Sequence, residues 1–425
     1  MKPSGIEWIG DIPDDWEVRK ITTLLDNIGS GTTPPNNTDF YENGIIPWLN
    51  TGDLTDNYVD LIENKITEYA LNQYSALKIF PKDSVVIAMY GATIGKLGIL
   101  RESASTNQAC CVMQCNDNLY FKFLFYSLYG YREYILTLSY GSGQPNISQK
   151  IIKDLRLPTP PLKTQQIIAD YLDEKCGEID ATIAKQKESI EKLKAYKQSL
   201  ISETVTKGLD KSAPLKPSGI DYLGDIPSHW EIRKLKYVAN FNQNTLPEDT
   251  DGQFELKYID IGNVSSVDGI KEIQYFNFSN APSRARRIVK YGDIIVSTVR
   301  TYLRAITSIK EDYDNCICST GFAVITPKDN FQQDFVVYAI ENESFIAQII
   351  ANSQGISYPA INVSQLENLK LAFPSVKEQK EIVDFLKTKL LEIDSIINKK
   401  QNIMQKLDTY KKSLIFEYVT GKKYV

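Results

Sequence analysis

Two stretches of the chain carry apolar residues at alternating spacings of three and four. The first begins at Leu172 and the second at Leu386, 214 residues later. This spacing places side chains on one stripe of an α-helix and is typical of the a and d positions of a coiled coil. The residues that we expect to form the seam with a partner helix are Leu172, Ile179, Ile183, Ile190, Leu193, Leu200, Leu386, Leu390, Ile393, Ile397, Met404, Leu407 and Leu414.

Each stripe also contains polar residues, and their places match. Gln186 and Lys197 interrupt the first stripe, and Lys400 and Lys411 interrupt the second after the same 214-residue interval. Polar residues at such positions can fix the register of a coiled coil at some cost in stability. Long side chains can also extend from the edge of a seam into water. The pattern alone leaves both interpretations open.

Prolines and glycines set the expected limits of both helices. Pro158, Pro160 and Pro161 precede the first stretch and Pro374 precedes the second, while Gly208 and Gly421 follow them. Each helix should span about 40 residues, or roughly 60 Å. Two such helices, each following a globular module, most simply pair antiparallel, which predicts a rod with a module at each end and a pseudo-twofold axis.

A long internal repeat supports this organisation. Residues 2–21 (KPSGIEWIGDIPDDWEVRKI) and 216–235 (KPSGIDYLGDIPSHWEIRKL) are identical at 13 of 20 positions without a gap. A match of this length indicates one module present twice. We therefore predict an α+β fold: two similar mixed α/β domains joined by two long antiparallel coiled-coil helices, in a pseudo-twofold repeat. The expected boundaries are 1–157 and 211–372 for the domains and 158–210 and 373–425 for the helical segments.

Short apolar runs predict matching strands in the two modules. Residues 84–89 and 293–298 have the composition of buried strands, and later strands follow the Ser-Thr pairs at 105–106 and 319–320. An apolar helix is expected in each copy, near residues 121–136 and 335–350. The modules therefore share a frame, whereas the loops between these elements differ in sequence.

Composition and cysteine content narrow the class of protein. The 425 residues are 42% hydrophobic and 24% charged, as in ordinary globular proteins, and no apolar run is long enough for a membrane span. The amino terminus lacks the apolar core of a signal peptide, so we expect reduced cysteines and a cytoplasmic location. The single histidine, His229, and the spacing of the six cysteines predict no metal site; Cys110, Cys111, Cys316 and Cys318 fit buried strands better.

Known catalytic motifs are also missing. Residues 91–97 resemble a phosphate-binding loop, but one residue is missing between the glycines and Leu97 stands where Ser or Thr would bind magnesium. The aromatic tetrad of amino-methyltransferases is absent. A loose nuclease-like pattern of Asp14, Glu63 and Lys65 is short enough to arise by chance. We therefore expect no catalytic residue and no cofactor bound by this chain.

Unlike loops on a common frame are the candidate ligand-binding residues. Arg, Lys, Asn, Gln, Ser, Thr and Tyr side chains can contact base edges and phosphates of DNA. The residues proposed for DNA contact in the first module are Thr32, Thr33, Tyr90, Thr93, Lys96, Asn107, Ser142, Gln144 and Asn146. Those in the second are Arg284, Arg286, Arg287, Arg300, Tyr302, Arg304, Ser353, Gln354 and Tyr358. Ordinary turns with solvated side chains would have the same composition, but a repeated frame with different loops favours a reader of two different half-sites.

The net charge of −5 argues against a nucleic-acid partner. Both globular parts have an acidic surplus, and only the C-terminal helical segment is basic. Any DNA-binding surface must therefore be a local patch. The charge leaves open a second possibility, that the two modules form a scaffold that binds proteins without contacting DNA.

A set of short motifs resembles the specificity (S) subunits of Type I restriction-modification enzymes over essentially the whole chain. They are the repeated Gly-Asp-Ile-Pro-x-x-Trp-Glu-x-Arg-Lys, the segments at 44–48, 51–53, 90–96, 144–148 and 160–166, the Ile-Asp pairs at 179–180 and 393–394, and the helix endings at 199–205 and 413–419. Each motif is weak alone, and the ordered set is specific.

The resemblance implies a non-catalytic subunit with two target-recognition domains, each of which reads half of a bipartite DNA site. It also implies docking of two methyltransferase subunits, and of translocase–nuclease subunits in the full complex. Those partners would supply S-adenosylmethionine, ATP and magnesium, and their basic surfaces would compensate for the acidic charge of this chain. Half-sites read on one DNA face should lie about 10 base pairs apart.

Overall fold

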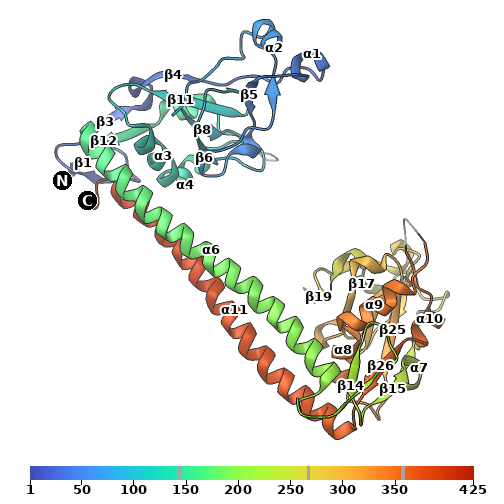
Figure 1. Cartoon of the computed structure of the whole chain (residues 1–425). Helices are drawn as coiled ribbons and strands as arrows, with labels where there is room; N and C mark the ends of the chain where they lie inside the picture. Colours follow the sequence, from blue (N-terminus) through green and yellow to red (C-terminus); the bar gives the residue numbers. More distant parts are fainter. Residues whose placement is uncertain (142–144, 266–268, 356–358) are drawn as a thin grey trace. The chain divides into compact units, whose positions relative to one another are not determined.

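A computed structural model of the chain describes residues 1–141, 145–265, 269–355 and 359–425. It contains two compact units: Met1–Lys187 with Lys400–Val425, and Glu188–Lys399. Each unit comprises one globular domain and one end of a pair of long helices (Figure 1). The globular part before the first long helix is termed domain 1, and the part between the two long helices is termed domain 2.

The two long helices are α6 (Leu162–Lys207, 46 residues) and α11 (Val376–Val419, 44 residues). They begin just after the predicted prolines: Pro161 directly precedes α6, and its carbonyl accepts from the Gln165 amide at 3.1 Å, while Pro374 lies two residues before α11. Proline suits the start of a helix, where no backbone donor is needed. Gly208 and Gly421 follow them with φ of +74° and +70°, the left-handed conformation in which glycine commonly ends a helix. The prediction of two long helices is confirmed, and both extend slightly beyond the expected 40 residues.

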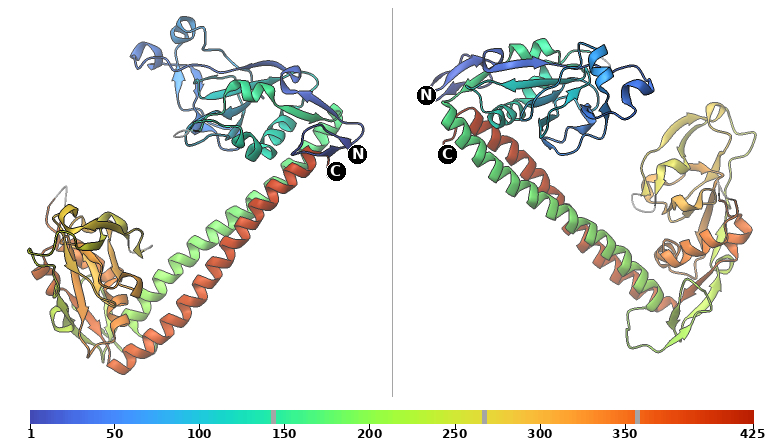
Figure 2. Two further views of the ribbon diagram at one scale, coloured as in Figure 1. Left: turned by 180° about the vertical axis from the view of Figure 1, so that it is seen from behind. Right: turned by 45° about the horizontal axis from the view of Figure 1, so that its top comes forward.

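The helices run antiparallel in both units (Figure 2). In the first unit the rings of Tyr171 and Tyr418 lie 4.7 Å apart, so the start of α6 faces the end of α11. In the second unit Lys197, near the end of α6, donates to Asp394 in the first half of α11 at 2.7 Å. All predicted seam residues are buried or half-buried.

The polar seam residues make specific contacts across the pair. Lys411 donates to Asp180 at 2.7 Å, and Lys197 makes the matching contact with Asp394. The 214-residue repeat relates these two ion pairs to each other. Lys400 donates to Gln186, its own repeat partner, at 3.0 Å. These contacts favour the interpretation that the polar positions fix the register, because a slipped pairing would separate every one of them.

Domain 1 is built on a five-stranded sheet in which only the β6–β9 pair is parallel. A smaller sheet pairs β5 with parallel β10 and antiparallel β7. The sheet elements are β4 (Leu25–Gly29), β11 (Cys110–Cys115), β8 (Val85–Ala88), β9 (Leu97–Leu100), β6 (Asn57–Val59), β10 (Ser105–Thr106), β5 (Ile46–Leu49) and β7 (Lys65–Ile66). The remaining elements are β1 (Lys2–Pro3), β2 (Asp11–Ile12), β3 (Glu17–Lys20), β12 (Arg156–Thr159), α1 (Thr38–Tyr41), α2 (Glu68–Gln73), α3 (Phe121–Gly130), α4 (Arg132–Thr137), α5 (Gln149–Asp154), η1 (Ile21–Leu24) and η2 (Thr51–Asp53).

Domain 2 has two four-stranded sheets, one fully antiparallel and one with a parallel β17–β24 pair. Their strands are β16 (Ala239–Phe241), β25 (Phe322–Pro327), β22 (Ile294–Ser297), β23 (Ile306–Ser308), β20 (Gln274–Asn277), β17 (Glu255–Ile259), β24 (Ile317–Ser319) and β21 (Ala285–Ile288). The remaining elements are β13 (Leu215–Pro217), β14 (Asp225–Pro227), β15 (Glu231–Lys234), β18 (Val264–Ser265), β19 (Gly269–Ile270), β26 (Lys370–Phe373), α7 (Leu235–Val238), α8 (Gln333–Ile340), α9 (Glu343–Ala351), α10 (Val363–Glu367), η3 (Ile261–Asn263), η4 (Phe278–Asn280), η5 (Thr301–Leu303) and η6 (Glu311–Tyr313).

The two domains share one topology, as the repeat predicts. The strand order β4-β11-β8-β9 in domain 1 matches β16-β25-β22-β23 in domain 2. Likewise β5, with its parallel and antiparallel neighbours, matches β17 with β24 and β20. The domains differ at the sheet edges, where β6 is added in domain 1 and β21 in domain 2. The internal repeat is therefore a property of the fold as well as of the sequence.

The central strands are buried on both faces, with side chains alternating between two cores. In β8, Val85 and Ile87 pack in the core that contains α3, whereas Val86 and Ala88 face a second cluster around Leu49. In β22, Ile294 and Ile295 alternate in the same way. This two-sided burial explains why both strands appear in the sequence as continuous apolar runs.

One prediction about the domains is wrong in detail: the single apolar helix is two helices in each copy. In domain 1 the break lies at Tyr131, whose φ of −95° and ψ of 0° leave the helical range. Its buried ring packs edge-on against Trp8, with the ring centroids 4.7 Å apart. In domain 2 the side chain of Asn342 accepts from the Ser344 amide at 2.8 Å and caps α9.

A buried glutamine fastens each domain to its long helix. Gln165 accepts a hydrogen bond from the Tyr120 amide at 2.8 Å and donates to the carbonyl of Pro160 at 2.9 Å. Its repeat partner Gln379 accepts from the Gln332 amide at 2.9 Å and donates to Pro374 at 3.0 Å. The same side chain thus holds the start of the first domain helix, α3 or α8, in both copies.

A salt bridge also joins each domain to its long helix, at the contact termed here the docking surface. The acidic and basic partners are exchanged between the two domains. In domain 1, Lys122 of α3 pairs with Asp173 of α6 at 2.5 Å. In domain 2, Asp334 of α8 pairs with Lys387 of α11 at 2.6 Å. The repeat relates Asp173 to Lys387, so the charge on the long helix is reversed between the copies.

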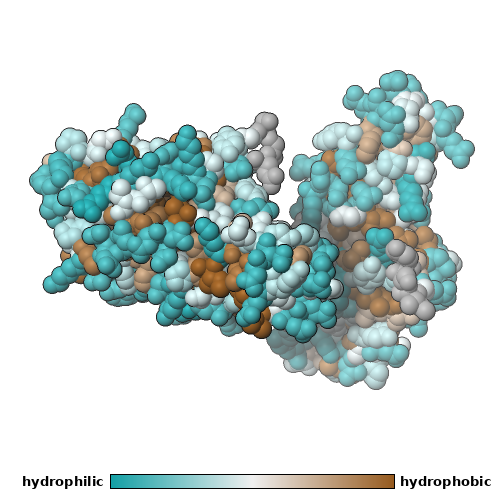
Figure 3. Space-filling view, turned by 90° about the horizontal axis from the view of Figure 1, so that it is seen from above, coloured by the Kyte–Doolittle hydropathy of each residue, from teal (hydrophilic) through white to brown (hydrophobic). Residues whose placement is uncertain are grey.

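The surface is mixed in polarity. Figure 3 shows one face, on which hydrophobic residues form small patches among hydrophilic ones. Within the ranges that the structure describes, no helix combines the length and the apolar character needed to cross a membrane.

Candidate nucleic-acid interface

In domain 1 two of the predicted loops lie side by side. The β8–β9 turn (residues 89–96) contacts the segment that follows α4, where Tyr90 and Asn146 form an antiparallel bridge. The Ile147 amide also donates to the carbonyl of Met89 at 2.7 Å. Thr93 is half-buried and Lys96 exposed on the same turn. The structure thus brings four predicted residues from two distant segments onto one surface.

Gln108, which the sequence interpretation did not select, connects a third loop to this surface. Its side chain accepts a hydrogen bond from the hydroxyl of Thr33 at 2.7 Å. Burial raises the pKa of Tyr90, and a hydrogen bond with Gln108 opposes this effect. Gln108 therefore joins the loop at residues 29–34 to the β8–β9 turn. Its place beside Asn107 in a polar segment was the available signal.

Two other predicted residues mainly support the loops of domain 1. Asn107 donates to the side chain of Asn50 at 3.0 Å and accepts from the Ala109 amide at 3.0 Å. The carbonyl of Thr32 accepts from the indole of Trp48 at 3.1 Å. Their DNA contacts stay predictions. Ser142, Gln144 and, in domain 2, Tyr358 lie outside the described residues.

Domain 2 repeats this arrangement with different side chains. The β22–β23 turn (residues 298–305) contacts the segment after α9 through a bridge between Val299 and Ala360. The hydroxyls of Thr301 and Ser353 lie 2.8 Å apart. Gln354, which is exposed, also bridges Ala360. The candidate loops therefore occupy the same topological position in both domains.

The β22–β23 turn presents its longest side chains to solvent. Arg300, Tyr302 and Arg304 are all exposed, and Tyr302 retains 52% of its accessible surface. Arg304 forms a surface ion pair with Glu343 at the start of α9, at 2.5 Å. Two cations and an aromatic ring on one turn suit contact with the phosphates and base edges of DNA.

The basic segment at 284–287 adjoins this turn. The carbonyl of Arg284 accepts from the amide of Thr320 at 2.8 Å. The residue after Thr320 is Gly321, and its carbonyl accepts from the amide of Thr298, at the start of the turn, also at 2.8 Å. Arg284 is exposed, and the guanidinium of Arg286 lies over the ring of Phe278 at 4.5 Å.

Arg287 is occupied within domain 2. Its guanidinium donates to the side chain of Asn242 and to the carbonyl of Phe322, and burial lowers its pKa. Arg287 thus contributes to the fold, and its predicted DNA contact stays a prediction.

Most of the cysteines expected in strands lie there: Cys110 and Cys111 in β11 and Cys318 in β24, whereas Cys316 directly precedes β24. All four are buried thiols, and burial raises the pKa of Cys318 to about 12. Across the described residues, no group of three or more His, Cys, Asp or Glu side chains is placed to hold a metal ion.

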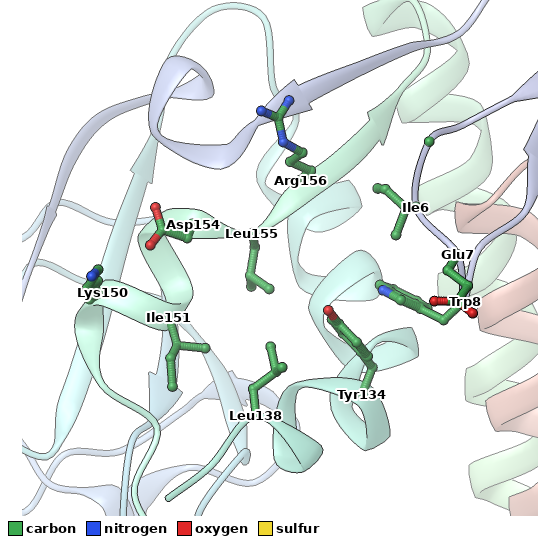
Figure 4. Close-up of a pocket in the computed structure, with 11 residues that line it drawn as sticks. Ile6, Glu7, Trp8, Tyr134, Leu138, Lys150, Ile151, Asp154, Leu155 and Arg156 are labelled. Carbon is green, nitrogen blue, oxygen red and sulfur yellow. The ribbon is translucent and has the colours of Figure 1, made fainter.

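One pocket of about 930 Å³ lies in domain 1 (Figure 4). Trp8 stacks on Tyr134 at 4.3 Å along one side of it. Its lining residues are Gly5, Ile6, Glu7, Trp8, Tyr134, Leu138, Lys150, Ile151, Asp154, Leu155 and Arg156. None of these is a predicted DNA-contact residue.

The two domains share one topology, present different polar loops at the same place and are each attached to a long helix. These features define the class of a recognition protein with two similar binding domains. The family model for the Type I restriction modification DNA specificity domain matches residues 13–194 and 227–405. The matched segments cover most of the chain and fall once on each copy of the repeat. The chain belongs to this family of DNA specificity proteins.

Curated relatives agree with the family assignment. The chain is 25% identical to the Type I restriction enzyme MjaVIII specificity subunit of Methanocaldococcus jannaschii over 97% of this chain and 93% of that protein. It is also 25% identical to the EcoBI specificity subunit of Escherichia coli over 81% of this chain and 74% of that protein.

Solved structures share the fold. A chain from a study of complex assembly in a type I R-M system has a TM-score of 0.71 at 14% identity, over 97% of this chain and all of that one. The HsdS subunit from Thermoanaerobacter tengcongensis has a TM-score of 0.54 at 15% identity, over 97% of this chain and 98% of that one. At these identities the similarity concerns the fold alone.

Proposed function

We propose that this chain directs a Type I restriction-modification complex to its DNA target, with each domain reading one half of a bipartite, asymmetric site. One observation carries the proposal: the β8–β9 and β22–β23 turns occupy the same place in one repeated frame but present different side chains. A common frame gives both domains the same approach to DNA. Different side chains let the half-sites differ in sequence.

The antiparallel helices would set the distance between the half-sites and dock two methyltransferase subunits. Their register is fixed by paired polar residues, which suits a spacer of constant length. Translocase–nuclease subunits would join in the full complex. The partners would supply S-adenosylmethionine, ATP and magnesium, this chain would catalyse no reaction, and the complex would act in the cytoplasm, where the DNA lies.

Methylation sequencing tests this proposal directly. The chain would be expressed with its methyltransferase subunit in a bacterial host without other DNA methylation. We expect one bipartite motif with two unlike halves and an unread spacer. A single continuous motif would contradict the assignment of one half-site to each domain.

The acidic net charge favours one alternative, a scaffold that binds proteins through both domains. The family match disfavours it. Pull-down with the methyltransferase, followed by a gel shift with genomic DNA fragments, separates the two. A scaffold would bind the methyltransferase without giving the complex sequence-specific affinity for DNA.

A further inference from the structure

The β8–β9 and β22–β23 turns have the same backbone but different residues at two left-handed positions. In domain 1 these are Gly91 and Gly95, with φ of +85° and +78°. In domain 2 they are Arg300 and Arg304, with φ of +50° and +53°. The hydrogen bond that closes the turn, from Ile94 to Gly91 in domain 1, recurs from Leu303 to Arg300. Arginine thus stands where this turn favours glycine.

Each of these arginines costs conformational free energy, because a β-carbon makes left-handed backbone unfavourable and glycine avoids the clash. Both side chains are exposed, and the Arg304–Glu343 pair is 43% and 60% exposed, where an ion pair adds little stability. Residues held in a sparsely populated backbone conformation cluster at ligand-binding sites.

The room around the first left-handed position also indicates that a side chain there is not needed for packing. A β-carbon added at Gly91 would meet no atom within 4 Å, so glycine there serves only the backbone conformation. Domain 2 uses the equivalent position to carry a long cationic side chain. The hydrogen bond between Thr301 and Ser353 ties the turn that carries both arginines to the segment after α9.

We propose that Arg300 and Arg304 are specificity-determining residues of domain 2, and that Glu343 positions Arg304. Their guanidinium groups contact base edges of DNA, at the O6 and N7 acceptors of guanine, because contacts to phosphate carry no sequence information. This inference rests on the proposed function and deepens it, since it assigns the contacts of one half-site to two residues. Domain 1 has glycine at both positions and reads its half-site without such contacts.

The test uses the full chain in complex with its methyltransferase subunits. The probe is a fluorescein-labelled duplex that carries the site found by methylation sequencing, with competitors in which each base pair is changed in turn. We expect Arg300→Gly and Arg304→Gly each to weaken binding about tenfold or more. The loss should fall on base pairs of one half-site only, with discrimination in the other half unchanged.

The melting temperature gives a second measurement, which should rise in the variants whose DNA binding falls. Because glycine relieves the backbone, both variants should melt a few degrees higher than the wild-type chain. The matched substitution in domain 1, Gly91→Ala, should lower the melting temperature instead. Arg233→Ala, at an exposed arginine elsewhere in domain 2, should leave DNA binding unchanged.

Lysine variants separate the two sources of acceptors. If the contact is to a guanine edge, Arg300→Lys should lose discrimination like the glycine variant, because lysine lacks the two-pronged fork. A contact to a phosphate would overturn the specificity assignment: the lysine variant would then keep most of the affinity, and the glycine variant would keep its sequence preference and reduce the salt dependence by about one ion.

Glu343 has its own diagnostic result. Glu343→Gln should alter discrimination at the same base pair as Arg304→Gly, and the double variant should be no worse than Arg304→Gly alone. Glycine variants that keep full specificity, or that melt at lower temperature, would overturn this inference while leaving the proposed function intact. A wild-type complex without sequence-specific binding would overturn both.

Discussion

At the scale of single residues, Glu341 is a carboxyl group whose pKa is shifted by its surroundings. It follows the last residue of α8, and burial raises its pKa to about 7 despite the opposing charges of Lys310 and Lys197. A carboxyl group with a raised pKa in the folded state binds more protons there than in the unfolded chain. The free energy of unfolding therefore falls as pH rises from about 4 to about 7.

Replacing Glu341 by Gln removes this pH dependence. We expect the variant to match the wild type near pH 4 and to be more stable by about 2 kcal/mol at pH 8, where the wild-type carboxylate is ionised while buried. Urea midpoints at the two pH values measure the difference. Glu248→Gln, at an exposed side chain of the same unit, is the control. An equal effect of Glu341→Gln at both pH values would contradict the role of ionisation.

Residues were harder to predict from the sequence than elements. Thr33, Tyr90 and Lys96 were selectable by type and by their place on loops. Gln108 was missed because its role depends on its contact with a loop 75 residues away. The strain at Arg300 and Arg304 was also invisible, since a basic turn gives no sign of left-handed backbone until its dihedral angles are known.

At the scale of elements, the paired helices depend on ion pairs whose burial differs. The side chain of Lys411 is 13% exposed, whereas that of Lys197 is 29% exposed. Burial alone would lower the pKa of Lys411, but the hydrogen bond and charge of Asp180 outweigh it and raise the pKa. The Asp180–Lys411 pair should therefore contribute more to stability than its repeat partner.

Asp180→Ala should cost about 1–2 kcal/mol, because it leaves the Lys411 ammonium buried and unpaired. Asp394→Ala should cost less than about 1 kcal/mol, since the lysine that it leaves unpaired, Lys197, is more accessible to water than Lys411. The double variant Asp180→Ala/Lys411→Leu should recover most of the loss, and Asp170→Ala, at an exposed position of α6, serves as the control. Chemical denaturation of the four variants measures these differences; no recovery in the double variant would argue against burial as the cause.

Gln165→Leu should weaken the attachment of domain 1 to the start of α6. The change keeps the side-chain volume but leaves the Tyr120 amide and the carbonyls of Asn118 and Pro160 without their partner. We expect a loss of about 2–3 kcal/mol in urea unfolding followed by tryptophan fluorescence. Gln166→Leu, at the exposed neighbouring position, should change stability by less than about 0.5 kcal/mol. Equal losses in both variants would show that the helix itself, and not the buried contact, is sensitive.

Elements were largely predictable because their signals are local and periodic. The seam of α6 and α11 followed from apolar spacing, and β8 and β22 from continuous apolar runs. The break at Tyr131 was missed although Gly130, the last residue of α3, is of a type that commonly ends a helix. The contact that Tyr131 makes there was not predictable, because its partner Trp8 lies more than 120 positions earlier in the chain.

At the scale of the whole molecule, charge limits what the chain can do alone. With a net charge of −5, the long-range field opposes approach to DNA, and only local groups such as Arg284, Arg300 and Arg304 favour it. The grip on the phosphate backbone should therefore come from partner subunits.

We expect the isolated chain to show no measurable affinity for its duplex at physiological salt, and the complex with methyltransferase subunits to bind it. The affinity of the complex should fall steeply as salt increases, because phosphate contacts release counterions. Fluorescence anisotropy with and without the partner measures both effects. Tight, salt-sensitive binding by the isolated chain would show that its own surface suffices.

The reversed salt bridges at the docking surfaces have an evolutionary consequence. If recombination moved the coding segment of domain 1 into the place of domain 2, Lys122 would meet Lys387 where Asp334 now meets it. The reverse transfer would set Asp334 against Asp173. Each exchange replaces an attraction by a repulsion of about 1 kcal/mol at a partly exposed site. New target sequences should therefore spread most readily by exchange between first domains or between second domains, which keeps each inherited half-site in its original position.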